Sequence, residues 1–327
     1  MVKIFDIRIE KSEKMIDFFN ALSTSVIMIM LMGIGYIMGR LGWMKESEKK
    51  FLSKFILNVA VPCVCITGIL NSLDRSMFAE LGIMLLVALL TMGIVLILGT
   101  IVGNLLHLPR KQKGVFISMC AFPNTIFIGL PVSKQLFGEE CVPYVMICYI
   151  ASTIMVQFIG ILLMEHAGGT NKKSSIKEIV KNVFTKAPVI GVIVALILLI
   201  ADARPPEFTM TFMGYIRDTV TPLALIFCGY ILYEIGLKNL RIQKGIPFML
   251  ILRLVVAPVI CLGIGILMKI EVFPRSVLLI ENALPVITQV SVMSGEYGAD
   301  EQYAVSGSAI SIFVGLLTIP IWMIILG

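Results

Sequence analysis

The fold is decided by two stretches, Ala121-Phe-Pro-Asn-Thr-Ile-Phe-Ile-Gly-Leu-Pro131 and Asn282-Ala-Leu-Pro-Val-Ile-Thr-Gln289. Each lies in the middle of a hydrophobic segment that is long enough to cross a bilayer, and each places a proline among polar side chains. A proline removes a helical hydrogen bond and tends to break the helix. In hydrocarbon, a broken backbone is tolerated only where protein or a water-filled cavity covers its polar groups. The sequence therefore predicts two broken membrane helices that build a polar site near the middle of the membrane.

The composition is that of a polytopic membrane protein. Of the 327 residues, 58% are hydrophobic and only 15% are charged, whereas soluble domains carry about 25% charged residues. Residues 1–19 are predicted to form a short N-terminal tail, because they lack the cationic start and apolar core of a signal peptide. The net charge of +6 is explained by basic loops on one membrane face, so no nucleic acid partner is expected.

No cofactor, metal site or disulfide is predicted. The seven cysteines mostly lie within apolar segments, where small polarizable side chains pack well, and the chain has only two histidines. The Cys63-Val-Cys65 pair has neither the spacing of a redox pair nor that of a zinc site.

Ten segments reach the length of about 20 mostly apolar residues that a membrane-spanning helix requires. The sequence therefore predicts an all-α membrane protein with ten transmembrane helices, of which the sixth is the shortest. The fourth and ninth helices contain the two breaks and are expected to cross at them. In chain order the predicted spans are residues 20–39, 51–70, 79–106, 114–137, 141–164, 184–201, 212–234, 245–268, 275–295 and 302–326.

The interruptions recur at a nearly constant offset. Pro62 and Pro123 are 61 residues apart, Pro222 and Pro285 are 63 apart, and the two halves are therefore offset by 160 to 162 residues. Matching features at a constant offset indicate an internal repeat. Five spans per repeat would place the second repeat upside down, as in many secondary transporters. The predicted units are a first five-helix repeat, a cytosolic linker and a second five-helix repeat, at residues 20–164, 165–183 and 184–327.

The distribution of Lys and Arg predicts the orientation of the chain, because these residues concentrate on the cytoplasmic face. The segments on one predicted face hold 15 of them, and those on the other hold 6, or 10 with the four in the N-terminal tail. The richer face is expected to be cytosolic. A multi-pass protein of the plasma membrane with both termini outside the cytoplasm is therefore predicted.

The two breaks also predict a binding site. A helix that restarts after a break presents an N-terminus with about half a positive charge and free N–H groups, which suits a carboxylate. Amide and hydroxyl side chains beside the prolines add hydrogen bonds. The predicted ligand is therefore a small organic anion. The residues expected to hold it are Pro123, Asn124, Thr125, Asn282, Pro285, Thr288 and Gln289.

Two charged side chains fall within predicted spans, where charge is expensive and often functional. Glu281 is predicted to couple transport to a proton or a cation, and the alternative is a carboxyl that is simply hydrated in the outer vestibule. Arg253 is interpreted as an anchor whose long stem reaches toward the cytosolic face, with pairing to an acidic group or attraction of the anion left open. The predicted hinges are Pro62, Pro222, Gly129 and Pro131.

These residues resemble the auxin efflux carrier family, which includes plant carriers and bacterial and fungal relatives. The resemblance covers nearly the whole chain after about residue 20. It rests on three motifs: Asn124-x4-Gly129-x-Pro131, Ala283-Leu-Pro-Val-Ile-Thr-Gln-Val-Ser-Val292 and Glu296-Tyr-Gly-Ala-Asp300. It implies a bacterial-type secondary transporter that works by an elevator-type alternating-access mechanism. The scaffold would consist of helices 1, 2, 6 and 7, and the mobile transport domain of helices 3–5 and 8–10.

The resemblance also implies a substrate class, which is a malate- or malonate-like carboxylate or an auxin-like acid. The long cytosolic loop of many plant members is missing, so auxin itself is not expected. The spacing of Gly33, Gly35 and Gly39 allows close helix contact and would permit a homodimer. Membrane lipid is the other expected partner.

Three other classes of membrane protein make different demands on the sequence. A membrane enzyme would need a catalytic cluster at a membrane face, and the loops offer only Glu139-Glu140 and Asp300-Glu301. A channel also uses broken helices, and it would conduct much faster than a carrier and without counterflow. A sodium-coupled symporter or antiporter of the related inverted-repeat fold would need a cage of carboxylates near the crossing, where the sequence places only Glu281.

Overall fold

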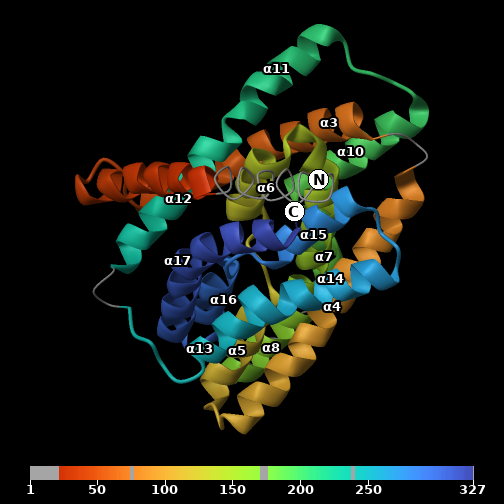
Figure 1. The fold of residues 1–327 in the computed structure, drawn as a ribbon. Coiled ribbons are helices and arrows are strands. Elements are labelled where there is room, and N and C mark those ends of the chain that lie inside the picture. The colour runs from red at the N-terminus through yellow and green to blue at the C-terminus, as the bar shows by residue number, and fades with distance from the viewer. Residues whose placement is uncertain (1–21, 74–76, 170–175, 237–239, 327) are drawn as a thin grey trace, which may run out of the picture.

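The computed structural model describes residues 22–73, 77–169, 176–236 and 240–326 (Figure 1). Within these ranges the chain is helical, and its only β-type contact is an isolated antiparallel bridge between Pro123 and Val286. The predicted N-terminal tail, residues 1–19, lies outside the described residues.

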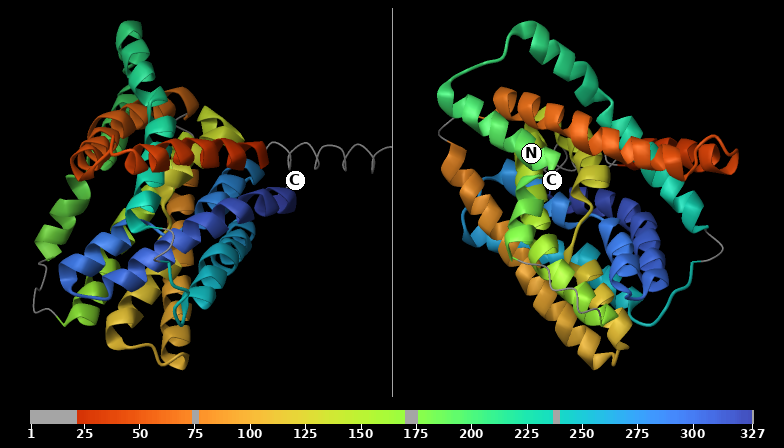
Figure 2. Two further views of the ribbon diagram at one scale, coloured as in Figure 1. Left: turned by 90° about the vertical axis from the view of Figure 1, so that its left-hand side faces the viewer. Right: turned by 180° about the vertical axis from the view of Figure 1, so that it is seen from behind.

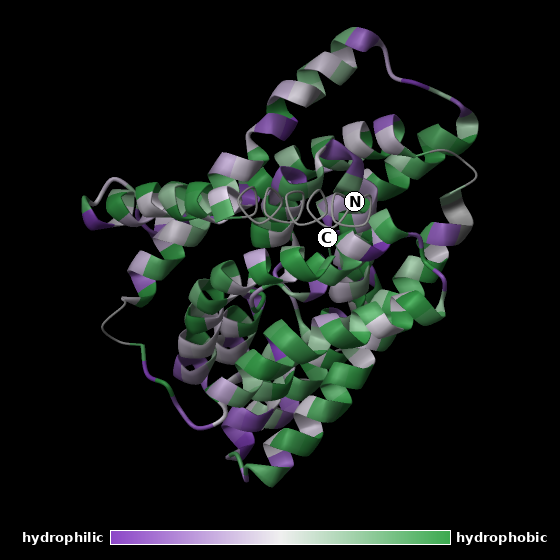
Figure 3. Ribbon diagram, viewed as in Figure 1, coloured by the Kyte–Doolittle hydropathy of each residue, from purple (hydrophilic) through white to green (hydrophobic). Residues whose placement is uncertain are grey.

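Seven of the described helical segments are long and apolar enough to cross a membrane, and each coincides with one predicted span. The chain is therefore a multi-pass membrane protein. Figure 3 shows apolar residues along the outer length of the helices and polar residues gathered near their ends and in the loops. The seven segments are Leu22–Arg40, Glu46–Ser72, Glu80–Leu105, Glu139–Gly168, Glu207–Ile235, Ile246–Leu267 and Glu301–Leu326.

Both predicted breaks are present. The fourth predicted span is divided into α5 (Arg110–Ala121), a π-helical turn η3 (Thr125–Gly129) and α6 (Leu130–Phe137). The ninth is divided into α15 (Val272–Asn282) and α16 (Gln289–Tyr297). None of these pieces is long enough to cross a bilayer alone, so the count of ten crossings stays a prediction.

The other elements follow the remaining predicted spans, except for α9 (Ile176–Phe184), which lies almost entirely in the predicted linker. The sixth is α10, a single apolar helix of 15 residues, Ala187–Ala201, which agrees with its being the shortest. The others, in chain order, are α2 (Glu46–Phe55), η1 (Ile56–Ala60), α3 (Val61–Ser72), α4 (Phe78–Leu105), η4 (Glu139–Cys141), α7 (Val142–Met155), η5 (Val156–Gly160), α8 (Ile161–Gly168), α9 (Ile176–Phe184), α11 (Glu207–Asp218), α12 (Val220–Ile235), α13 (Ile246–Ile251), η7 (Leu252–Val256), α14 (Ala257–Leu267) and α17 (Glu301–Leu326).

Prolines explain most of the irregular turns. Three of the four described π-helical turns end two residues before a proline: η1 before Pro62, η3 before Pro131 and η7 before Pro258. A proline cannot donate to the carbonyl of the preceding turn and its ring clashes with that carbonyl, and a wider turn relieves both problems. Pro222 is the third residue of α12, just after the discontinuity at Thr219.

The buried apolar residues form two clusters that meet where the chain is broken. Ile126 and Leu284 belong to the first cluster, which also holds the buried parts of α3, α7 and α12. Phe122 and Val286 belong to the second, with α5 and α13. Each broken segment therefore passes from one apolar core to the other within a few residues. The polar groups of both breaks lie at that junction.

The first helix packs on α12 at a distance that only glycine allows. A Cβ atom at Gly35 would lie 1.9 Å from the Ile226 carbonyl oxygen, and one at Gly229 would lie 1.8 Å from the Met32 carbonyl oxygen. Gly39, also on the first helix, faces the ring of Tyr233 on α12. The small residues considered for a homodimer are thus partly used within one chain.

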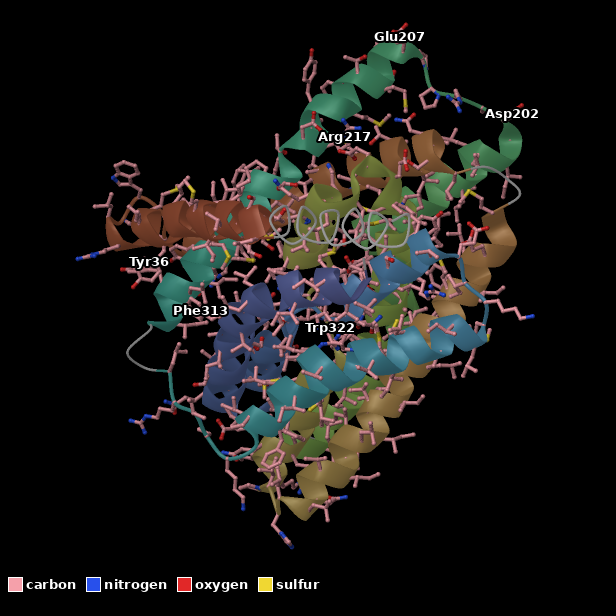
Figure 4. The ribbon with its side chains drawn as sticks, in the orientation of Figure 1. Tyr36, Asp202, Glu207, Arg217, Phe313 and Trp322 are labelled. Atoms are coloured by element: carbon pink, nitrogen blue, oxygen red, sulfur yellow. The ribbon has the colours of Figure 1, made fainter. Side chains whose placement is uncertain are left out.

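Figures 1 and 2 show α11 projecting from the rest of the helices. In Figure 4, Glu207 lies at the outer end of this helix and Arg217 lies closer to the bundle. Its contacts within the chain are mainly with α3, so α11 is remote from the two breaks.

Candidate functional site

The two breaks lie against each other and pair their backbones. The Asn124 N–H donates to the Pro285 carbonyl over 2.9 Å, and the Ile287 N–H donates to the Phe122 carbonyl over 3.0 Å. These bonds satisfy polar groups that the missing helical turns would otherwise leave unpaired, which is a requirement at membrane depth. The crossing of the two broken segments is thus fixed by main-chain hydrogen bonds that do not depend on side-chain contacts.

Both broken segments restart as helices on one side of this crossing. The Asn124 carbonyl accepts the N–H groups of Ile128 and Gly129 and so begins the helical path of η3 and α6. On the other segment, α16 begins at Gln289. The first N–H groups of a helix have no partner within it and carry a partial positive charge. Two such helix starts lie side by side at the crossing.

A cavity of about 450 Å³ opens next to these two helix starts. Small-molecule sites commonly measure about 300–1,000 Å³, so its size suits a metabolite. Most of its lining is apolar, and Phe127 and Phe227 stack there with ring centroids 4.6 Å apart. Five of the seven predicted binding residues line it: Pro123, Asn124, Thr125, Thr288 and Gln289.

Two residues of the cavity wall, Asn124 and Ser152, carry a buried side-chain atom, Nδ2 and Oγ respectively, that has no hydrogen-bond partner within the described part of the chain. The buried hydroxyl of Thr125, a third lining residue, interacts with the Glu281 carboxyl. These residues are only 1%, 2% and 2% exposed. Leaving a buried polar group unpaired costs about 1–3 kcal/mol. The unpaired groups of Asn124 and Ser152 can both donate a hydrogen bond, so an acceptor-rich ligand would satisfy them.

Ser152 was missed by the sequence interpretation. It lies on α7, which has no break, and a serine within a long apolar helix gives little signal. The polar residues that follow it at Thr153 and Gln157 also line the cavity. The signal that could have identified this part of the cavity lining is the presence of three polar residues within six positions of one membrane span.

Charged residues of both signs also line the cavity. The Lys49 ammonium donates to both carboxylate oxygens of Glu234, at 2.9 and 2.8 Å, and Lys186 and Glu301 are the other two. Lys49 and Lys186 belong to segments that the Lys and Arg distribution assigns to the cytosolic face. The cavity thus reaches from the crossing to residues that are predicted to lie near the cytosolic face.

Asn282 and Pro285 are not among the residues that line the cavity. The Asn282 side-chain nitrogen donates instead to the Leu278 carbonyl at 2.9 Å and to the Cys261 sulfur at 3.3 Å. The Pro285 ring packs against α17, where a Cβ at Gly315 would lie 2.7 Å from it. The predicted symmetry between the two breaks therefore holds for the backbone and not for these side chains.

Glu281 is fully buried, so the alternative of a carboxyl hydrated in an open vestibule is wrong. Its Oε1 accepts a hydrogen bond from the Ser133 hydroxyl at 2.7 Å, and the carboxyl also interacts with the Thr125 hydroxyl. Gly129, a predicted hinge, packs on this carboxyl, because a Cβ there would lie 2.6 Å from Oε2. Glu281 is not a lining residue of the cavity.

Arg253 lies on η7 and is also fully buried. Its guanidinium donates hydrogen bonds to backbone carbonyls at the crossing, including that of Ala121 at 2.8 Å. The expectation that the Arg253 stem reaches toward the cytosolic face is therefore wrong, whereas its interpretation as a structural anchor agrees with these bonds. An arginine surrounded by apolar residues in the sequence gave no indication of which carbonyls it meets.

Comparison with known proteins agrees with this architecture. The membrane transport protein family matches residues 21–323. The chain belongs to that family. It is the auxin efflux carrier family that the motifs of the two breaks predicted, and that prediction is confirmed.

The relatives are transporters that carry no assigned substrate. An uncharacterized transporter of Methanothermobacter thermautotrophicus is 24% identical over 320 residues, which cover 94% of this chain and 99% of the relative. A second, from Methanocaldococcus jannaschii, is 26% identical over 304 residues, or 91% of this chain and 96% of the relative. The uncharacterized transporter YfdV of Escherichia coli is 20% identical over 316 residues, covering 94% and 98%. The match spans both breaks in every case.

Proposed function

We propose that this protein is a secondary active transporter of a small organic anion in the plasma membrane. The observation that carries the proposal is the cavity at the crossing, whose lining residues Asn124 and Ser152 each carry a buried donor atom with no partner among the described residues. Two helix starts add partial positive charge beside them. A carboxylate offers the acceptors that this set lacks, and it is held by charge-assisted hydrogen bonds.

The packing of the helices supports an elevator-type mechanism with two inverted repeats. The helices assigned to the scaffold contact one another: α3 packs on α10 and α11, and α2 packs on α12. Those assigned to the transport domain do likewise, since α4 packs on α5 and α14, and α16 packs on α8 and α17. The crossing belongs entirely to the second group and would move with it as one body.

The groups that line the cavity suit two classes of anion, and the experiment compares both. Its hydroxyl and amide groups suit a malate- or malonate-like dicarboxylate. The stacked Phe127 and Phe227 rings suit an acid with an apolar body, such as an auxin-like acid. Both classes share the carboxylate that the crossing would bind.

The proposal is tested on purified protein by thermal unfolding and then in proteoliposomes. Malate, malonate and indole-3-acetate are compared with their uncharged amides, with and without sodium and at two pH values. A ligand present at a hundred times its Kd stabilises a protein by about 2.7 kcal/mol, so a carboxylate should raise the unfolding temperature by several degrees and its amide should not. Counterflow of the labelled acid would then separate a carrier from a channel. Equal stabilisation by acid and amide would contradict an anion site.

The orientation gives an independent prediction. A cysteine replacing Lys177 on α9 should be unreactive toward a membrane-impermeant thiol reagent on intact cells, because α9 is expected on the cytosolic face. A cysteine appended after Gly327 should react. Labelling of broken cells is the control that both cysteines are accessible. The reverse pattern would contradict both the topology and the inverted repeat.

A further inference from the structure

One guanidinium serves the carbonyl ends of both broken helices. From Arg253, Nε donates to the Leu284 carbonyl at 3.1 Å, and Nη2 donates to the Asn282 carbonyl. Nη1 donates to the Ala121 carbonyl at 2.8 Å and to that of Cys120 at 3.4 Å. The Asn282 carbonyl lies at the end of α15 and the Leu284 carbonyl lies two residues beyond it, while the other two carbonyls belong to the end of α5. Arg253 therefore caps two helix C-termini that come from opposite halves of the chain.

The electrostatic balance of this arrangement is nearly complete. The C-terminal end of a helix carries about half a negative charge. Two such ends meet at Arg253, and their sum of about one negative charge matches the single positive charge of the guanidinium. An arginine is well suited to this position because its planar fork offers five donors and stays protonated in proteins.

The consequence concerns the opposite side of the crossing. The helix starts at Thr125 and Gln289 line the cavity and carry partial positive charge. The helix ends at Ala121 and Asn282 lie a few residues earlier in the same two broken segments. Without a countercharge, the negative ends would offset the positive starts as seen from the cavity. With Arg253 in place, the positive starts remain uncompensated.

We infer that Arg253 is a positioning and charge-setting residue that makes the crossing attractive to anions. It does so without touching the ligand, since Arg253 is not a lining residue of the cavity. Its four backbone bonds also hold the two breaks in one rigid unit. The inference rests on the proposed anion site, and its test uses a readout that needs no transported substrate.

The test measures the local potential with a cysteine introduced at Ser291, which lines the cavity and is a small, nearly isosteric change. The purified Ser291→Cys protein is treated with a negatively charged and a positively charged methanethiosulfonate reagent, and the ratio of the two rates is recorded. The same chain without that cysteine corrects for the seven native ones. Added Arg253→Gln should lower the anion-to-cation ratio by about tenfold, as expected for removal of one partly screened charge. Added Arg253→Lys should keep it within about twofold.

Hydrogen exchange tests the structural half of the inference. Arg253→Lys keeps the positive charge but loses the planar guanidinium that donates to four backbone carbonyls. Backbone amide hydrogen exchange should therefore become faster at residues 118–124 and 282–288 together. The matched control is Arg275→Lys, an arginine at the other end of α15 that also bonds to a backbone carbonyl, that of Ile270. It should alter neither the rate ratio nor exchange at the breaks.

The outcomes separate this inference from the proposed function. An unchanged ratio in folded Arg253→Gln would overturn the charge-setting role. If that variant gives no folded protein, Arg253→Lys carries the test alone, and unchanged exchange at either break would overturn the inference. A changed ratio together with no carboxylate binding by the unmodified protein would reject the proposed substrate class and leave the role of Arg253 standing.

Discussion

Asn124→Ala is expected to lower the transport rate of a carboxylate substrate at limiting concentration by about ten- to a hundredfold. A hydrogen bond to a charged group contributes about 1.5–3 kcal/mol, which corresponds to that range. The free energy of unfolding should change little, because the Asn124 side-chain nitrogen has no partner in the described structure. The backbone bonds of Asn124 to Pro285 and Gly129 hold the crossing, and alanine retains them. Initial uptake rates in proteoliposomes and thermal unfolding of the same preparation measure the two effects.

The second break supplies a matched control. Asn282 is as deeply buried as Asn124, at 1% exposed, yet its side chain bonds to Leu278 and Cys261 and does not line the cavity. Asn282→Ala should therefore lower the unfolding temperature, with a smaller effect on substrate affinity in the protein that remains folded. Wild-type uptake kinetics in Asn124→Ala would contradict the proposed site and leave the fourth span as a broken helix without a ligand.

The contrast between these two asparagines marks how far the sequence could lead. Prolines, flanking polar residues and a repeated spacing act through the backbone, and they located both breaks to within a few residues. The direction in which a side chain points depends on neighbours from distant elements. The Asn282 amide donates to Cys261 on α14 and does not line the cavity. Nothing near residue 282 in the sequence indicates that contact.

The two buried charges show the same limit. The sequence placed Glu281 and Arg253 within apolar spans and so marked both as unusual. It left the hydration of Glu281 and the direction of the Arg253 side chain open, because both depend on where α6, α5 and α15 pack. Ser152 was missed for a related reason, since only the assembled cavity distinguishes it from a serine that packs in a helix.

The second large effect is expected at Glu281. Glu281→Gln should retain binding of the substrate and abolish the response of transport to a pH gradient. The carboxyl is fully buried beside Ser133 and Gly129, and an ionised carboxyl is costly to move through hydrocarbon. Glutamine has the shape of the protonated acid and can still accept the Ser133 hydrogen bond, so the fold should be retained. Uptake into proteoliposomes with and without an inward proton gradient measures the response.

A charged neighbour and a conservative control make this prediction specific. Among the described residues, the titratable groups that interact electrostatically with Glu281 are Arg253 and the thiols of Cys141 and Cys148, and the arginine stays charged throughout. Ser133→Ala removes the hydrogen bond and keeps the carboxyl, so its transport should still respond to the gradient. If Glu281→Gln responds like the wild type, Glu281 does not carry the coupling proton. If the wild type responds to a sodium gradient and not to protons, and Glu281→Gln loses that response, the carboxylate is a cation ligand. In both cases the predicted effect of Asn124→Ala stands, because Glu281 does not line that cavity.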